Sequence, residues 1–130
     1  WWNDEEEPFA DQWKCIQERL KNPEYREGNI WLMGDFNSQD DVRGEGYDLV
    51  LKSGWKDTYL LAEEKDDGIT VAEEIDGWRE ADGRSRAAKH EKRLDYIFCN
   101  TQADVRTSNV ICNGKNAPVV SDHYGVVITV

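Results

Sequence analysis

The stretch that decides the fold reads Asn-Ile-Trp-Leu-Met-Gly-Asp-Phe-Asn and occupies residues 29–37. Its first part, 29–34, contains an apolar run without alternation, which predicts a β-strand buried on both faces. Asp35 and Asn37 follow this strand directly, so a carboxylate and a carboxamide can converge on one point. Asp supplies a hard oxygen ligand or a proton acceptor, and Asn offers a donor and an acceptor without charge. Alternatively, the two side chains only cap a turn.

A second stretch, Arg-Leu-Asp-Tyr-Ile-Phe at residues 93–98, places one acid inside an apolar strand. Burying a carboxylate is costly unless it is paired or hydrogen-bonded, so Asp95 needs a partner, usually a His or an Arg. Ser-Asp-His at 121–123 precedes a final strand rich in β-branched residues. Histidine is well suited to accept a proton near neutrality when a carboxylate fixes its tautomer. We therefore expect His123 and Asp95 to form a hydrogen-bonded pair, whereas His90, among charged residues, is interpreted as solvated surface.

The remaining elements follow from the spacing of apolar residues. Phe9, Trp13, Ile16 and Leu20 recur at helical steps and predict an amphipathic helix. We expect a helix over Pro8–Lys21, a helical face formed by Tyr47, Val50 and Leu51, an extended Trp55–Leu61, an irregular Glu63–Lys92, and strands at Arg93–Cys99, Val105–Ile111 and Tyr124–Val130.

Composition limits the class of protein. The 130 residues amount to at most one domain (1–130), with 38% hydrophobic and 33% charged residues. No apolar run approaches the roughly 20 residues that a membrane span requires, so we expect a soluble, globular chain with no membrane partner. Three widely spaced cysteines without a CxxC motif favour a reducing, cytoplasmic location. The net charge of −11 disfavours nucleic acid as a partner, but a small phosphorylated substrate can be held locally.

The three motifs, in this order and each beside a strand, resemble the endonuclease/exonuclease/phosphatase superfamily. The resemblance covers about residues 29–130 and implies an α+β fold, namely the four-layer α/β-β/α sandwich of that type. It also implies Mg²⁺-dependent hydrolysis of a phosphoester, with Mn²⁺ as the alternative metal. Such a metal needs only one or two carboxylates besides water and substrate phosphate.

The resemblance assigns roles to five residues. His123 matches the histidine that activates the attacking water or stabilises the phosphoryl oxygen, and Asp95 matches the acid that orients it. Asp35 and Asn37 match the catalytic pair that contacts the phosphate and positions the nucleophile, with Asp35 also a metal ligand. Asp122 matches the acid near the metal. We expect Asp35, Asn37, Asp122 and His123 to cluster at one end of the sheet.

The resemblance also implies that part of the domain is missing. Family members carry a metal-binding Glu and an Asn on earlier strands, and nothing before Asn29 supplies those strands. The chain, which begins with Trp1 rather than Met, therefore looks like the C-terminal half of the sandwich, either processed or a fragment. We expect the remaining N-terminal half, or a neighbouring chain, to be a partner that covers one sheet face. The residues expected on that face are Ile30, Leu32, Leu94, Tyr96, Phe98, Val126 and Ile128.

Within the superfamily, the start of the chain and the long segment before Arg93 are most similar to bacterial sugar-phosphate phosphatases of the maltose 6'-phosphate phosphatase type. The expected function is a phosphatase acting on a small phosphorylated metabolite such as a sugar phosphate. Alternatives are a DNA-repair endonuclease or exonuclease, a sphingomyelinase-like phosphodiesterase, and a non-catalytic fragment or binding module. Basic residues of the long segment are candidates to cover the substrate, chiefly Arg84 and Arg86, with Arg79 and Lys89 beside them.

Overall fold

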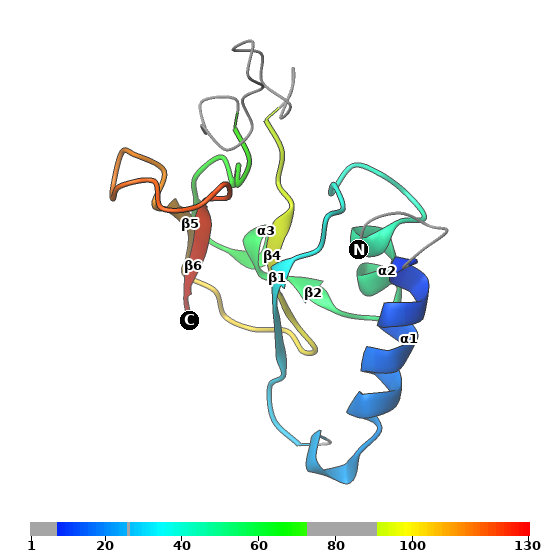
Figure 1. Cartoon of the computed structure of the whole chain (residues 1–130). Coiled ribbons are helices and arrows are strands. Elements are labelled where there is room, and N and C mark those ends of the chain that lie inside the picture. Colours follow the sequence, from blue (N-terminus) through cyan, green and yellow to red (C-terminus); the bar gives the residue numbers. More distant parts are fainter. Residues whose placement is uncertain (1–7, 26, 73–90) are drawn as a thin grey trace.

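Two three-stranded β-sheets form the framework of the chain in a computed structural model, which describes residues 8–25, 27–72 and 91–130. Figure 1 shows helices α1 and α2 on one side of the first sheet and strands β5 and β6 on the other. The elements are α1 (Phe9–Leu20), the 3-10 helix η1 (Pro23–Tyr25), β1 (Trp31–Asp35), α2 (Gly46–Lys52), β2 (Lys56–Asp57), α3 (Thr58–Leu61), β3 (Glu64–Lys65), β4 (Asp95–Cys99), β5 (Thr107–Ile111) and β6 (Gly125–Thr129).

The first sheet has the order β1-β4-β2, with β4 antiparallel to both neighbours. Its register places Leu32 opposite Phe98 and Asp35 opposite Asp95. The second sheet has the order β3-β5-β6, in which β3 and β5 are parallel and β5 and β6 are antiparallel. The two acidic motifs therefore lie on adjacent strands of one sheet, with Asp35 at the end of β1 and Asp95 at the start of β4. The histidine motif leads into β6 of the other sheet.

Helix α1 confirms the predicted amphipathic pattern. Phe9 and Trp13 are buried, and Ile16 and Leu20 pack against the same cluster. The Trp13 ring meets Trp55 edge-on at a centroid distance of 6.1 Å, and its Nε1–H donates to the Ser53 hydroxyl at 2.9 Å. The core of buried aromatic and aliphatic side chains between α1, α2 and the first sheet consists of Phe9, Trp13, Tyr47, Val50, Trp55, Tyr96 and Phe98.

The expectation that residues 29–34 are buried on both faces is wrong for this chain. Met33 is 68% exposed, and Trp31 and Leu32 are only half-buried. Side chains alternate between the faces of a strand, so the register that turns Leu32 toward Phe98 and the aromatic core turns Met33 to the opposite face. An apolar run cannot show by itself which of its faces is covered within the same chain.

Two expectations for the middle of the chain also need correction. Trp55–Leu61 is extended only in β2, because the Asp57 carboxylate accepts a hydrogen bond from the Tyr59 N–H and caps the short helix α3. The segment 63–92 is not wholly irregular, since it contains β3 and a bridge between Val71 and Lys92. Residues 73–90, with Arg79, Arg84, Arg86, Lys89 and His90, lie outside the described residues.

The predicted partner-facing surface is partly wrong as well. Tyr96 and Phe98 are buried in the aromatic core of this chain, so no second sheet is needed to cover their side chains. The large apolar side chains that are exposed are Met33, Leu60, Ile111, Val119, Val120, Val127 and Val130. Among the described residues, no helix combines the length and the apolar character needed to cross a membrane.

Candidate functional site

Asp35 and Asp95 face each other across two strands. Asp35 is the last residue of β1, Asp95 is the first of β4, and the two are direct register partners. Directly opposite residues in an antiparallel pair have Cβ atoms roughly 4.5–5.5 Å apart, and like charges in such a pair repel. The register therefore creates a place where two carboxylates converge and where a cation or a proton donor is stabilising.

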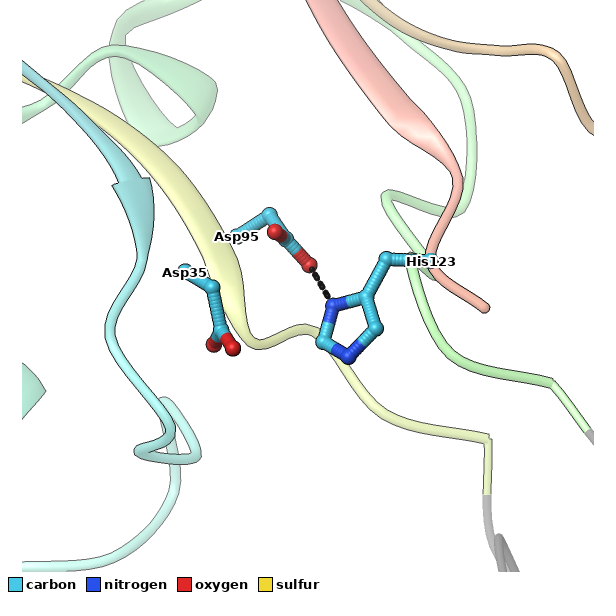
Figure 2. Close-up of side chains that lie close together, drawn as sticks. All are labelled: Asp35, Asp95 and His123. Atoms are coloured by element: carbon cyan, nitrogen blue, oxygen red, sulfur yellow. Dashed lines mark hydrogen bonds and ion pairs between the residues drawn. The ribbon is translucent and has the colours of Figure 1, made fainter. Parts of the chain in front are cut away.

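His123 meets this pair from the other sheet. Its Nδ1 lies 2.7 Å from Oδ2 of Asp95, and the two side chains are only 17% and 18% exposed. The predicted hydrogen-bonded pair is thus confirmed. Because an ionised carboxylate can only accept, Nδ1 donates, and Nε2 becomes the proton-accepting atom of the neutral ring. Figure 2 shows this second nitrogen turned away from Asp95.

Asn37 holds the carboxylate of Asp35. Its backbone N–H donates to Oδ1 of Asp35 at 2.7 Å, and its side-chain Nδ2 donates to Oδ2 at 2.9 Å. The backbone of Asn37 is left-handed, with φ of 46°, a conformation that Asn tolerates better than most residues. Asp35 and Asn37 therefore do cap a turn, and this does not exclude the roles that the resemblance implies for them. The same turn also fixes the orientation of an exposed carboxylate at the strand end.

One ligand atom from each of Asp35, Asp95 and His123 lies within 4.8 Å of the other two, and we call these residues the Asp–Asp–His group. They come from β1, β4 and the segment before β6, as Figure 2 shows. In the described part of the chain, no other set of His, Cys, Asp and Glu side chains comes together in this way. The predicted clustering of Asp35 with His123 is confirmed.

Two parts of the predicted site are not in this group. Asp122 is adjacent to His123, and its Oδ1 accepts from the Ser121 hydroxyl, but it does not belong to the Asp–Asp–His group. Arg84 and Arg86 fall in the part of the chain that the structure does not describe. The roles assigned to all these residues remain predictions.

Sequence reasoning missed Thr70. It is fully buried, and its hydroxyl accepts from the N–H groups of Leu94 at 3.1 Å and Asp95 at 3.3 Å. Its carbonyl accepts from the N–H of Tyr124, next to His123, at 2.8 Å. The short β-branched run Ile-Thr-Val at 69–71 could have suggested an extended, pairing segment. Nothing in this run indicates that Thr70 contacts both the segment of Asp95 and the segment of His123.

The comparison with solved structures identifies the family. An endonuclease/exonuclease/phosphatase family protein from Leptotrichia buccalis C-1013-b is 41% identical over 92% of this chain, with a TM-score of 0.71. This chain belongs to the endonuclease/exonuclease/phosphatase family. The resemblance based on the three motifs is thereby confirmed, and so is the mixed α/β fold. The chain spans 42% of the length of that protein, so it corresponds to part of the sandwich.

More distant structures share the fold alone. A mannosyl-6-phosphatase from Bacteroides thetaiotaomicron VPI-5482 is 19% identical, with a TM-score of 0.62 over 93% of this chain and 43% of that one. A functionally unknown conserved protein from Enterococcus faecalis V583 is 19% identical, with a TM-score of 0.64 over 93% and 44% of the two chains. No protein-family model and no curated protein sequence matches the chain.

Proposed function

We propose that the whole protein is a Mg²⁺-dependent phosphoester hydrolase, and that it acts as a phosphatase on a small phosphorylated metabolite such as a sugar phosphate. The observation that carries this proposal is the Asp95–His123 pair, seated opposite Asp35 in a chain of this family. A carboxylate that fixes a histidine beside a second carboxylate provides a base and a cation site next to each other.

His123, Asp95 and Asn37 have distinct tasks in the proposed hydrolysis. Water attacks the phosphorus in line, and His123 accepts its proton at Nε2 or, when protonated, donates to a phosphoryl oxygen. Asp95 accepts from Nδ1–H, which holds the tautomer and stabilises the imidazolium that forms. Asn37 keeps Asp35 aimed at the site through two hydrogen bonds. The alcohol leaves with a proton from solvent or from the imidazolium.

The donor atoms fit a hard divalent cation. Mg²⁺ prefers oxygen and is usually held by one or two carboxylates with water and substrate phosphate, and Asp35 and Asp95 supply two carboxylates. The imidazole nitrogen makes Mn²⁺ the natural alternative metal. When bound, the cation would neutralise the negative charge of the phosphoryl oxygens. Asp35 is the primary ligand in this proposal, because Asp95 already binds His123.

A hollow of about 500 Å³ beside these motifs supports a small substrate. Its lining includes residues 39–41, shortly after Asn37, and residues 91–93, shortly before Asp95. The lining residues are Gln39, Asp40, Asp41, Tyr59, Asp67, Ile69, Glu91, Lys92 and Arg93. Such a polar wall suits the hydroxyl groups of a sugar better than a DNA backbone, which the net charge of −11 would also repel.

The experiment measures hydrolysis by the full-length protein, with Mg²⁺ and with EDTA. Release of inorganic phosphate reports on the phosphomonoesters, and the freed aryl alcohol, the nicked strand or the released phosphocholine reports on the diesters. Substrates are sugar phosphates, an aryl phosphodiester, an abasic DNA duplex and sphingomyelin. We expect Mg²⁺-dependent turnover of the sugar phosphates, abolished in Asp35→Asn and retained in Asp104→Asn, which also removes one exposed carboxylate. Cleavage of abasic DNA or sphingomyelin instead favours the nuclease or the lipid hydrolase. No turnover of any substrate favours the non-catalytic alternative.

A further inference from the structure

The catalytic pair proposed above spans two sheets. Asp95 begins β4 of the first sheet, whereas His123 precedes β6 of the second, 28 residues further along the chain. Strand pairing within either sheet fixes only one of the two residues. A separate connection must set the distance between them, because a misplacement of about 1 Å at reacting groups can lower a rate on the order of 100-fold.

Thr70 makes that connection with three of its backbone and side-chain groups. Its hydroxyl oxygen accepts from the N–H groups of Leu94 and Asp95, at the point where the chain enters β4. Its carbonyl oxygen accepts from the N–H of Tyr124, directly after His123. Its own N–H donates to the carbonyl of Lys92 at 2.9 Å. One fully buried residue thus bonds to the backbone beside both members of the pair.

The edge of β4 explains why a side chain is needed there. Strand β2 pairs only with Phe98 and Cys99, so the start of β4 lacks a strand on that side. Two buried threonines take its place. The Thr58 hydroxyl donates to the carbonyl of Ile97 at 2.8 Å, and the Thr70 hydroxyl accepts from the N–H of Asp95. Both are 0–1% exposed, but only Thr70 also reaches the segment of His123.

We propose that Thr70 is a positioning residue, which holds Asp95 and His123 at hydrogen-bonding distance by bonding to the backbone beside each of them. The proposal rests on the proposed function, since it treats this pair as the working acid–base unit. Thr70 contributes orientation and not chemistry. Its loss therefore lowers kcat and leaves KM nearly unchanged.

The test compares Thr70→Val, Thr70→Ser and Thr58→Val in the full-length protein. Valine keeps the shape of threonine but cannot accept the two hydrogen bonds, whereas serine retains the hydroxyl. Thr58→Val removes an equally buried hydroxyl from the same edge of β4. We expect Thr70→Val to lower kcat about 10- to 100-fold with KM within about threefold, while Thr70→Ser and Thr58→Val retain kcat within about threefold.

A spectroscopic readout separates this proposal from the proposed function. The proton between Nδ1 of His123 and Asp95 gives a strongly deshielded ¹H NMR signal, which can be recorded without substrate or metal. We expect Thr70→Val to lose or broaden this signal, and Thr70→Ser and Thr58→Val to keep it. If the wild-type protein hydrolyses no phosphoester, the proposed function fails, and the signal still tests Thr70.

The outcomes are decisive even if the valine variant does not fold. In that case Thr70→Ala, which leaves room for a water molecule, replaces it in both measurements. A valine or alanine variant that only lowers the melting temperature, with kcat and the signal intact, overturns the proposal. Equal losses in Thr58→Val and Thr70→Val overturn it too, because they would indicate general loosening of β4.

Discussion

Two groups of charged side chains flank the start of β4, and they differ in how completely they are enclosed. The first, which we call the Arg93 cluster, consists of Arg93, Asp40, Asp57 and Tyr47. The guanidinium of Arg93, 6% exposed, pairs with Asp57 at 2.7 Å and Asp40 at 2.9 Å and lies over the Tyr47 ring at 5.5 Å. The Tyr47 hydroxyl donates to Asp57 at 2.9 Å. The second is the Asp–Asp–His group, whose Asp95 lies two residues after Arg93 in the chain.

The Asp–Asp–His group is left partly open. Its Asp35 is exposed, and Asp95 and His123 retain 17–18% of their side-chain surface. In the Arg93 cluster the central pair is enclosed, with Arg93 6% and Asp57 1% exposed, and only Asp40, 43% exposed, lies at the open edge. Charges that are buried and fully paired have no remaining capacity to bind a substrate. Charges that meet at a surface while a neighbour fixes their orientation retain it. The comparison teaches that enclosure of the central Arg93–Asp57 pair, and not the number of charges, separates the structural cluster from the candidate site.

The pKa values of Tyr47 and Arg93 are consistent with a structural role for the Arg93 cluster. Burial raises the pKa of Tyr47, and the negative charge of Asp57 raises it further. Burial alone would lower the pKa of Arg93, but Asp57 and Asp40 more than offset it, so the pKa is raised. Tyr47 therefore stays protonated and Arg93 stays charged through the range in which proteins normally work. These two groups thus keep one protonation state, as a structural element requires.

The largest expected effect is a loss of kcat on substitution within the Asp–Asp–His group. Asp95→Asn should lower kcat about 10²- to 10⁴-fold, because an amide can no longer both fix Nδ1–H and stabilise the imidazolium. The free energy of unfolding should change little, since the side chain is near the surface. Steady-state kinetics and denaturant unfolding of the full-length protein check both points. A variant with near wild-type kcat would remove Asp95 from the proposed mechanism.

The enclosed cluster should respond in the opposite way. Arg93→Met should lower the free energy of unfolding by about 3–5 kcal/mol, because it leaves Asp57 buried and uncompensated. The double variant Arg93→Met/Asp57→Asn should recover part of this loss, because the uncompensated charge is then gone. Denaturant unfolding measures stability. Arg93 also lines the hollow proposed for the substrate, so we expect any kinetic change to fall mainly on KM, with kcat per folded molecule within a few-fold of wild type. A 100-fold loss of kcat in folded Arg93→Met would abolish the distinction between the two regions.

The sequence revealed one region better than the other, for a physical reason. A lone acid in an apolar strand and a histidine before the next strand predict each other, since both need a partner, and the 2.7 Å contact confirms it. The partners of Arg93 lie 36 and 53 residues earlier in loops and strand ends whose acids look like ordinary surface residues. No short-range pattern connects them. Thr70 was missed because its hydroxyl and its carbonyl accept from backbone N–H groups far along the chain, and no short-range pattern of side chains indicates such contacts.

The fold shows the same limit. Helix α1 was predictable because its apolar spacing is local, and its buried face is confirmed. The helical turn after Asp57 was not, because one side-chain cap outweighs the extended preference of a β-rich run. The faces of β1 and β4 were assigned wrongly, because an apolar strand does not show which face its own helices cover. Tertiary packing decides that question.

A smaller effect should reveal which apolar face the rest of the protein covers. Met33 is 68% exposed at the centre of β1, on the face opposite the aromatic core. If the remainder of the domain buries it, as we propose, Met33→Ser should destabilise the full-length protein by about 1.5–3 kcal/mol. The matched change Val120→Ser, at a loop residue 76% exposed, should remain within about 0.5 kcal/mol. Equal, small effects in thermal unfolding would show that the Met33 face is uncovered.

The smallest effect concerns a charge of intermediate enclosure. Asp48, in the first turn of α2, accepts from the Gly44 N–H at 2.8 Å and pairs with Lys52 at 2.6 Å, although the Lys52 side chain is 66% exposed. The hydrogen bond from Lys52, and then that from Gly44, hold the pKa of Asp48 below its ordinary value. The folded protein therefore binds this proton less readily than the unfolded chain. The resulting stability is fully present above the ordinary pKa and is lost as the pH falls through the lowered one.

Asp48→Asn should accordingly destabilise the protein slightly at neutral pH and by less in acid below the lowered pKa. Added salt should shrink the difference at neutral pH, because the Lys52 end of the pair is open to solvent. Urea unfolding of wild type and variant at both pH values, with and without salt, measures these differences. A salt-insensitive loss as large as that of Arg93→Met would contradict the argument, because a half-open ion pair would then stabilise the fold as strongly as an enclosed one.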